Sequence, residues 1–421
     1  MIELLKKIYH KLSDYKIVQW AGHLYTNGSP IGNYKAYLRL KNLSKQQKHH
    51  GKIRVVFLGQ NASVWNKLQS VYEKMVEDDR FEVSLLAIPE HITSVDTKSF
   101  DYFFRLYGDR VLNAYIEGRW LDLEGLKPDY VFYQRPYDQY LPKEYRSDVV
   151  SRYAKICHVV YGYQVAKTTE SSVLNKRFFR NVYMYFAENS IYYEMNRKRF
   201  QKSHKEGVRK TLNIGYPALE KFVKQKEEPK AGEKKFHVLW TPRWTEDKDC
   251  GGSNFITFKD KVLELVQNKN IFLCFRPHPM TFDHFISVGR ITREEVDRYV
   301  ECYEKSEQMH YDNGASYEKT FWNSDMLLTD VSSVIAEYFL TGKPVVYCET
   351  GSVPNQLLEE MMKVFYVVKT WEEAKEKVLA LSQGIDPLKE ERERKIEELM
   401  GSDFEHISQR FLEEIYRDYN S

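Results

Sequence analysis

The sequence has few cysteines, no long apolar run and no segment built to cross a membrane. No stretch of about 18 consecutive apolar residues is present, which excludes a membrane-spanning helix. The N-terminus lacks the apolar core and small-residue cleavage site of a signal peptide. The five cysteines are scattered and form no CxxC pair, which argues against a disulfide framework or a zinc site and for a cytoplasmic protein. They are Cys157, Cys250, Cys274, Cys302 and Cys348.

Charge is distributed unevenly although the net charge is only +3. Residues 1–54 contain eleven Lys or Arg and two acids, so the rest of the chain is net acidic. The first twelve residues also alternate apolar and lysine side chains. This basic amphipathic leader, residues 1–50, suits either an anionic membrane surface, with the chain peripheral on the inner face of the cell membrane, or an ordinary surface helix. No recognition motif accompanies the charge, so nucleic acid is not an expected partner.

Apolar strands alternate with helices in both halves of the chain, whose 421 residues exceed one typical domain. Strands are expected at residues 53–58, 81–88, 130–133, 236–240, 271–276, 326–329 and 344–348, and helices at 65–76 and 333–340. A Lys/Glu-rich stretch, residues 221–235, has the composition of a linker. This rhythm predicts an α/β protein with two doubly wound Rossmann-type domains facing across a cleft. The expected domains are residues 51–204 and 205–387, followed by a helical tail, 388–421, that could cross back to the first domain.

The most informative segment is residues 325–344, where a buried strand ends at Asp330 and small hydroxyl residues open a helix. Backbone N–H groups at a helix start bind anions, and Ser332 and Ser333 can donate to phosphate oxygens. Glu337 lies four residues beyond Ser333 on the same face, where it can accept from ribose hydroxyls. Asp330 is counted with them as a candidate residue of the diphosphate site. Helix capping by Asp330 or Ser332 is the alternative, but it does not account for two hydroxyls and a carboxylate.

Two further loops follow predicted strands. In the first, Pro277 and Pro279 bracket His278, which can donate to a diphosphate or protonate a leaving group, unless it is simply a packed histidine. Arg276 beside it can bind phosphate or form a surface ion pair. In the second, Thr241-Pro242-Arg243-Trp244 offers a guanidinium fork for phosphate and a surface for the nucleotide, or alternatively an aromatic packed under a loop.

These motifs come in an order that resembles a known family. The set comprises Gly215-Tyr216-Pro217, Thr241-Pro242-Arg243-Trp244, His278-Pro279, the segment 328–333, Glu337-Tyr338 and Lys343-Pro344. Over roughly residues 205–350 it is similar to the C-terminal half of the CDP-glycerol glycerophosphotransferases, the teichoic-acid and capsule polymerases and primases. The resemblance implies the family's GT-B architecture for the whole chain. The family's usual TDYSS…DY pattern is altered here to Val331 and Glu337.

The resemblance implies that His278 contacts the donor diphosphate, that Ser332 and Ser333 hold phosphate, and that Glu337 holds ribose. It also implies attack by an acceptor hydroxyl on the phosphorus next to glycerol, with departure of CMP. No metal or other cofactor is expected, because GT-B enzymes generally neutralise the diphosphate with helix dipoles and basic side chains.

The N-terminal half departs from the family pattern, since the usual Trp-His-Gly-Thr segment is missing. His158 is one candidate for the base, unless it is buried at a strand end, and Asp138 is the other. Arg135 is a candidate contact for an acceptor phosphate, and Asn61 lies in an acceptor-side loop after the first strand.

The resulting hypothesis is a transferase that moves glycerol phosphate or ribitol phosphate from a CDP-alcohol to a glycan or lipid-linked acceptor. Two alternatives remain at this point. One is a GT-B glycosyltransferase that uses a nucleotide sugar, and the other is a non-catalytic nucleotide-binding protein of the same fold. The oligomeric state is left open.

Overall fold

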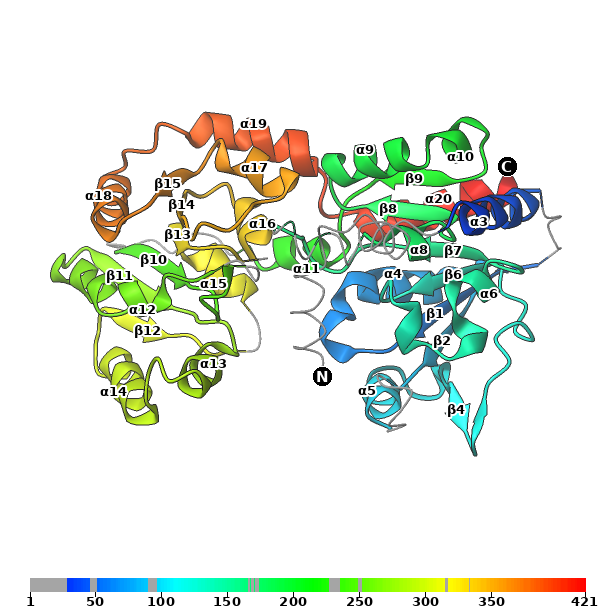
Figure 1. Cartoon of the computed structure of the whole chain (residues 1–421), viewed down its shortest axis with the longest axis horizontal. Helices are drawn as coiled ribbons and strands as arrows, with labels where there is room; N and C mark the ends of the chain where they lie inside the picture. Colours follow the sequence, from blue (N-terminus) through cyan, green and yellow to red (C-terminus); the bar gives the residue numbers. More distant parts are fainter. Residues whose placement is uncertain are drawn as a thin grey trace, which may run out of the picture. The chain divides into compact units, whose positions relative to one another are not determined.

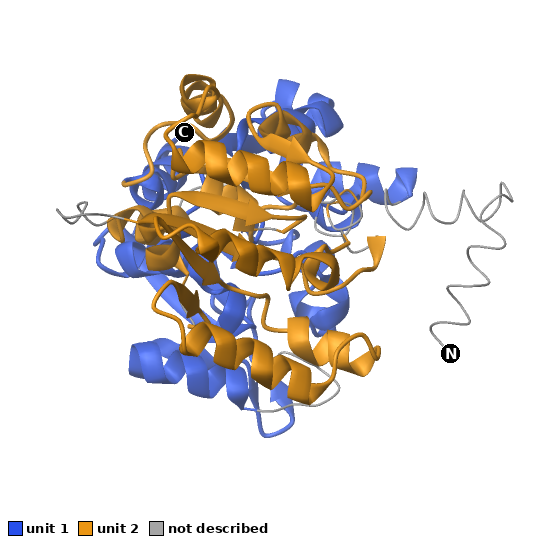
Figure 2. Ribbon diagram, turned by 90° about the vertical axis from the view of Figure 1, so that its left-hand side faces the viewer, with its two compact units in different colours: residues 1–161, 171–218, 406–421 blue, residues 162–170, 219–405 orange. Residues whose placement is uncertain are grey.

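The computed structural model describes residues 29–45, 51–89, 97–165, 167, 170, 174–226, 235–248, 252–314, 317–332 and 334–421. These form two compact units, each built on its own parallel sheet (Figures 1 and 2). Unit 1 comprises residues 1–161, 171–218 and 406–421, and unit 2 comprises residues 162–170 and 219–405. The predicted α/β class with two Rossmann-type sheets is confirmed. Of the predicted leader, residues 1–50, the structure describes only residues 29–45. Its amphipathic start, the first twelve residues, lies outside the described part of the chain.

The sheet of unit 1 has seven strands in the order β3-β2-β1-β6-β7-β8-β9, and every neighbouring pair is parallel. Strands buried on both faces read as continuous apolar runs, and Tyr130–Tyr133 and Met184–Ala187 are buried throughout. The strands are β1 (Ile53–Gly59), β2 (Phe81–Ala87), β3 (Val111–Asn113), β6 (Tyr130–Tyr133), β7 (Lys155–His158), β8 (Met184–Ala187) and β9 (Lys210–Asn213). A short antiparallel pair, β4 (Tyr115–Ile116) and β5 (Arg119–Trp120), stands apart from this sheet.

Helices pack around the sheet of unit 1 (Figure 1). Ser29 caps α3 by accepting from Gly32 N, and Pro30 occupies the first turn, where its missing N–H costs nothing. The helices are α3 (Pro30–Leu43), α4 (Asn66–Val76), α5 (Lys98–Tyr107), α6 (Ser147–Val150), α8 (Lys176–Phe179), α9 (Ser190–Arg199), α10 (Gln201–Lys205) and α20 (Ile407–Asn420).

The sheet of unit 2 has six parallel strands in the order β12-β11-β10-β13-β14-β15. The chain builds outward from β10 through β11 and β12, and then returns to β13 on the other side of β10. The order therefore reverses between β10 and β13. The strands are β10 (Phe236–Thr241), β11 (Ile271–Phe275), β12 (Met309–Tyr311), β13 (Met326–Thr329), β14 (Val345–Cys348) and β15 (Tyr366–Val368).

Aromatic rings fill much of the core of unit 2, where Trp240, Phe255 and Phe275 lie within about 6 Å of one another. The helices are α11 (Ala218–Lys224), α12 (Phe255–Phe258), α13 (Thr281–Ser287), α14 (Arg293–Glu304), α15 (Glu318–Asn323), α16 (Val334–Phe339), α17 (Gln356–Met362), α18 (Trp371–Ser382) and α19 (Lys389–Met400).

The predicted linker is partly wrong. Residues 221–224 belong to α11, because Leu219 and Phe222 are buried and Trp322 Nε1 donates to Phe222 O at 2.8 Å. Residues 227–234 lie outside the described part of the chain.

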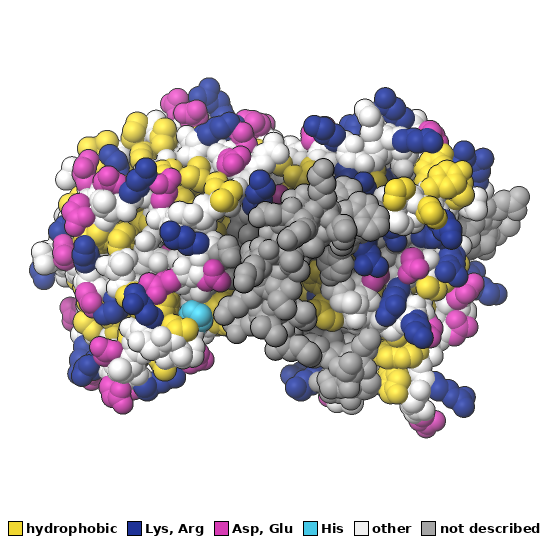
Figure 3. All heavy atoms as spheres, in the orientation of Figure 1, with side chains coloured by type: hydrophobic (Ala, Val, Ile, Leu, Met, Phe, Trp, Pro, Cys, Tyr) yellow, Lys and Arg dark blue, Asp and Glu magenta, His cyan; other side chains and the backbone are white. Residues whose placement is uncertain are grey.

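In the parts of the chain that the structure describes, we find no helix long and apolar enough to cross a bilayer. On the face drawn in Figure 3, charged side chains of both signs are interspersed with hydrophobic ones.

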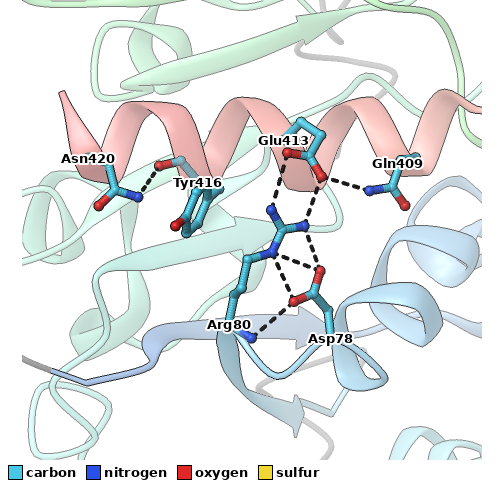
Figure 4. Close-up of polar contacts among 6 residues, drawn as sticks. All are labelled: Asp78, Arg80, Gln409, Glu413, Tyr416 and Asn420. Atoms are coloured by element: carbon cyan, nitrogen blue, oxygen red, sulfur yellow. Dashed lines mark hydrogen bonds and ion pairs between the residues drawn. The ribbon is translucent and has the colours of Figure 1, made fainter.

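The C-terminal helix α20 belongs to unit 1. Phe411 stacks on Phe186 with ring centroids 3.9 Å apart. Arg80, at the start of β2, is held between Asp78 and Glu413 at 2.6 and 2.8 Å, so the turn before β2 and the helix share one guanidinium (Figure 4). The buried Asp418 forms ion pairs with Lys155 at 2.8 Å and Lys210 at 2.6 Å. These contacts tie the last 16 residues to unit 1.

Candidate functional site

A cavity of about 430 Å³ lies in unit 2, where the strands of its sheet end. The segments after β10, β11, β12 and β13 all contribute to its wall, so it lies at the carboxyl edge and at the point where strand order reverses. Open α/β sheets bind ligands at this position. The lining residues are Thr241, Pro242, Arg276, Pro277, His278, Pro279, Phe282, Tyr311, Asp312, Asn313, Gly314, Tyr317, Phe321, Ser332 and Val334.

The two central strands are joined at this edge by a pair of threonines. The Thr241 hydroxyl donates to Thr329 Oγ1 at 3.0 Å, and the Thr329 hydroxyl donates to Thr241 O at 2.7 Å. Thr241 and Pro242 are therefore held rigidly in the wall of the cavity, as expected for residues predicted to lie against a nucleotide.

His278 has a defined hydrogen-bonding state. Its Nδ1 accepts from the backbone N–H of Met280 at 3.2 Å, so the proton of the neutral ring lies on Nε2. Partial burial and the nearby charge of Arg243 lower the pKa of His278 below its usual range, which keeps the ring neutral near pH 7. His278 therefore presents a neutral N–H donor at the cavity wall.

Asp330 is buried and holds a loop in place. Its carboxylate oxygens accept from Arg243 N at 2.6 Å and from Asn254 N at 2.8 Å. Burial raises the pKa of Asp330 to about 7, against these two hydrogen bonds and the charge of Arg243. This arrangement fits a positioning role for Asp330, because both acceptor oxygens are occupied and a phosphate oxygen brings no proton to donate.

Ser332 and Glu337 follow β13 in the order that the sequence predicts. Ser332 lines the cavity, whereas Ser333 lies outside the described residues. Burial raises the pKa of Glu337 to about 7, and a hydrogen bond from the side chain of Tyr317, itself in the cavity wall, opposes this shift. Since α16 has only six residues, its macrodipole is small, and anion binding here depends mainly on side chains.

Arg276 is committed to the loop that follows β12. It donates to Asp312 Oδ2 at 2.7 Å and to Gly314 O at 2.7 Å, while Thr320 also donates to Asp312 at 2.6 Å. Of the two interpretations of Arg276, the structure therefore supports the ion pair, which shapes one wall of the cavity.

The end of β12 and the loop that follows it also line the cavity, although no sequence motif marked them as part of the site. Tyr311, Asp312 and Tyr317 all line the cavity, and Phe282 and Phe321 add further aromatic surface. The Asp312-Asn313-Gly314 turn after a short apolar segment was the available signal. Residues 309–311 form only a three-residue strand, which is too short to stand out by periodicity.

In unit 1, the predicted acceptor-side residues also lie at the carboxyl edge, between β1 and β6, where strand order reverses. Gln134 joins the two segments, because its Oε1 accepts from Gln60 N and Asn61 N, both at 2.7 Å. Asn61 Oδ1 caps the following turn by accepting from Ser63 N at 2.8 Å. Arg135 contacts Gln60 Oε1 at 3.4 Å and lies over the Tyr140 ring.

The two candidates for the base occupy structural positions. His158 is fully buried, with its Nδ1–H donating to Tyr133 O at 3.0 Å and its ring against Phe178 and Phe179. Burial lowers the pKa of His158 well below its usual range. Asp138 accepts from Ser147 N and from Ser147 Oγ, both at 2.7 Å, and so anchors the start of α6. The structure supports the packed alternative for His158.

A buried acid and a buried lysine that the sequence did not single out lie near His158. The Lys67 ammonium donates to Val159 O, and its charge reaches both Glu188 and His158. Burial raises the pKa of Glu188 to about 7, against a hydrogen bond from Tyr185 and the charge of Lys67. Lys67 lies on the buried face of α4, and no local motif distinguishes it from an ordinary helix lysine.

Among the described residues, we find no group of His, Cys, Asp and Glu side chains arranged to hold a metal ion. Metal independence stays a prediction.

Comparison with solved structures identifies the class of fold. UDP-GlcNAc 2-epimerase from Methanocaldococcus jannaschii superimposes with a TM-score of 0.58 at 12% identity, over 87% of this chain and 100% of that chain. The enzyme from Neisseria meningitidis, solved with UDP-GlcNAc, gives 0.54 at 13%, over 87% and 100%. The wall teichoic acid polymerase TagF gives 0.51 at 13%, over 93% and 98%. These similarities confirm a GT-B-like fold.

One family model matches part of the sequence. Residues 159–351 match the model of the CDP-glycerol:poly(glycerophosphate) glycerophosphotransferases, which confirms the resemblance seen in the motifs. The match includes every residue that lines the cavity of unit 2. A comparison with curated protein sequences finds no match. The family match supports a transferase of the glycerophosphotransferase type.

Proposed function

We propose that this protein transfers glycerol phosphate or ribitol phosphate from a CDP-alcohol to a hydroxyl of a cell-surface glycan or lipid-linked acceptor. The acceptor oxygen forms a bond to the phosphorus that carries the alcohol. The bond from that phosphorus to the oxygen bridging to CMP breaks, CMP leaves, and the hydroxyl proton passes to a basic group or to solvent. The reaction contributes to the synthesis of a capsule or teichoic-acid-type polymer.

The observation that carries this proposal is that His278 lines the cavity at the switch point of unit 2 while its Nδ1 already accepts from Met280 N, which leaves the proton of the neutral ring on Nε2. A diphosphate needs hydrogen-bond donors that remain in place as negative charge moves to the leaving phosphate. His278 and the Ser332 hydroxyl supply donors, and the charge of Arg243 lies close to His278. In this proposal Ser333 adds a second hydroxyl, and no metal ion is required.

The remaining walls suit a nucleoside. Phe282, Tyr311 and Phe321 provide flat apolar surface for a base. Glu337, hydrogen-bonded by Tyr317 at the wall, is placed in this proposal to accept from ribose hydroxyls. On the acceptor side, Arg135 and Asn61 are proposed to contact the incoming chain.

A nucleotide-sugar glycosyltransferase is the second candidate. It is favoured by the neighbouring structures, because the Neisseria meningitidis enzyme was solved with UDP-GlcNAc and its TM-score is at least as high as that of TagF. A non-catalytic nucleotide-binding protein is the third, and the buried His158 and the occupied Asp138 favour it.

A thermal-shift panel separates these candidates by donor class. The panel contains CDP-glycerol, CDP-ribitol, and UDP-, GDP- and CMP-sugars at equal concentrations, with wild type and Ser332→Ala in parallel. A ligand that binds only the folded protein raises its stability with the logarithm of its concentration over Kd. We expect the CDP-alcohols to raise Tm most, and Ser332→Ala to reduce that rise. A larger rise with a UDP- or GDP-sugar would contradict the proposal.

A further inference from the structure

Unit 1 contains a second cavity, of about 320 Å³, between the start of α3 and the segments that follow α8 and α9. All of its lining residues belong to unit 1. None of the segments that carry the predicted acceptor-side residues contributes to it. On the face drawn in Figure 3, Lys and Arg side chains lie beside hydrophobic ones over this part of unit 1.

The lining of this cavity is strongly cationic. It contains five basic side chains and no acidic one: Lys176, Arg180, Arg199, Lys202 and Arg209. The nearest acid in contact with lining residues is Glu206, which accepts from Tyr37 and lies 4.0 Å from Lys202. Asp138 and Asp148 act on Arg180 only through their charge. Positive charge in the cavity therefore exceeds negative charge.

Two of the guanidiniums are withdrawn from solvent. Arg209 is 3% exposed, donates to Phe179 O at 2.7 Å and Arg180 O at 2.8 Å, and lies 3.8 Å above the Phe200 ring. Within the described part of the chain, the Nε atoms of Arg209 and Arg180 are buried and have no hydrogen-bond partner. The positive charge of both guanidiniums acts on the cavity through space, so an anion bound there lowers the electrostatic cost of burying that charge.

The backbone of α3 leaves room for this arrangement. A Cβ on Gly32 would overlap Arg180 Nη1, so any other residue at position 32 would displace that guanidinium. Asn33, in the first turn of this 14-residue helix, lines the cavity, so the positive end of the helix macrodipole adds to the same field.

We propose that this cavity is a phosphate-binding site, which takes a phosphate monoester or phosphodiester group between α3 and the Arg180–Arg209 pair. The site is separate from the donor cavity of unit 2 and does not depend on which donor that cavity takes. The phosphate could belong to a soluble molecule or to an anionic lipid headgroup. Ile31, Tyr34 and Leu38 are 70%, 59% and 40% exposed on α3, which gives the lipid source an apolar surface beside the cavity.

The test compares wild type with the double variant Lys176→Gln/Lys202→Gln, whose side chains line the cavity without being fully buried. The control variant Lys35→Gln/Lys45→Gln, in which both lysines are exposed and lie outside the lining, is matched to it in charge. Each protein is titrated calorimetrically with inorganic phosphate and with glycerol 3-phosphate, and is tested for flotation with phosphatidylglycerol and with phosphatidylcholine vesicles. Far-UV circular dichroism and Tm verify folding.

We expect wild type and the control variant to bind one phosphate ligand or the anionic vesicles. We expect the double variant Lys176→Gln/Lys202→Gln to bind at least about tenfold more weakly, since it removes two of the five lining cations. Vesicle binding without binding of soluble phosphate identifies a headgroup as the source, and the reverse identifies a soluble ligand. Equal binding by the double variant and wild type, or no binding of any probe by wild type, would overturn the proposal.

Discussion

His278 is oriented by the backbone and not by another side chain, because its Nδ1 accepts from Met280 N. We propose that its Nε2–H donates a hydrogen bond to the donor diphosphate. We expect His278→Ala to lower kcat about 10²–10³-fold, as when one donor to a developing oxyanion is removed. His284→Ala is the control, since His284 also packs against Trp244, at 4.9 Å, but does not line the cavity. Comparable loss in both variants would show that packing, not the N–H, matters.

Glu337 supplies a pH dependence of donor binding. Burial raises its pKa to about 7, so the carboxyl is mostly neutral at pH 6 and ionised at pH 8. Only the ionised form accepts from both ribose hydroxyls, so we expect Kd for cytidine, which carries the ribose but no titrating phosphate, to fall several-fold between pH 6 and 8. In Glu337→Gln the same titration should be nearly flat. A wild-type Kd that is independent of pH would contradict the ribose role.

The same pKa has an opposite effect on stability. The folded protein holds the Glu337 proton up to about pH 7, whereas the unfolded chain releases it near 4.5. The stabilising contribution is therefore complete below pH 4.5 and is lost as pH rises through 7. Buried Asp330 and Glu188 have raised pKa values of about 7 and add to this trend.

At the scale of elements, Lys343 connects a family motif to helix capping. Its ammonium donates to three carbonyl oxygens at the end of α15: Phe321 O at 3.3 Å, Ser324 O at 2.5 Å and Trp322 O. Cations at a helix C-terminus stabilise it. We expect Lys343→Met to lower the free energy of unfolding by about 1–3 kcal/mol in urea denaturation. The exposed Lys389→Met should change it by less than about 0.5 kcal/mol.

Helix α20 depends on Asp418. Burial opposes its ionisation, but Lys155, Lys210 and Tyr130 outweigh burial and lower the pKa of Asp418. Removing one partner of a buried ion pair leaves the others uncompensated, so we expect Asp418→Ala to cost about 3–5 kcal/mol by thermal or urea unfolding. The stability from Asp418 is present above about pH 3.8 and is lost as pH falls through its lowered pKa. A cost below about 1 kcal/mol would contradict this role.

Elements with long apolar runs could be predicted from the sequence, because burial on both faces of a parallel sheet leaves a clear signal. The strands at 130–133 and 326–329 were predicted with the observed bounds. The composition of residues 221–224 predicts a linker, because charged residues surround the buried apolar side chains of α11, Leu219 and Phe222. The sequence predicts one helical tail over residues 388–421. The structure has two helices there, α19 and α20, and Gly401, with φ 85°, follows the last residue of α19.

The site was predictable where donors follow long strands, as at Thr241, His278 and Ser332. It was not predictable where roles depend on distant partners. Whether Asp330 binds a ligand or the backbone is decided by Asn254, 76 residues earlier in the chain. Arg276 is likewise committed by Asp312, and His158 by the packing of Phe178 and Phe179.

At the scale of the whole molecule, two parallel sheets carry different kinds of polar site. The switch point of unit 2 holds neutral donors with aromatic walls, whereas the cavity of unit 1 beside α3 is lined by five cations. The first is proposed to take a nucleotide and the second a phosphate group, and each cavity is lined by residues of a single unit.

The most direct test of the central claim is the nucleotide product of a single turnover assay. The purified chain is incubated with CDP-glycerol and a glycerol-phosphate-primed acceptor, and the products are separated by anion-exchange chromatography. We expect CMP to be released in an amount equal to the glycerol phosphate added to the acceptor, and we expect His278→Ala to abolish both. Release of a nucleoside diphosphate from a nucleotide sugar, with CDP-glycerol left unconsumed, would contradict it.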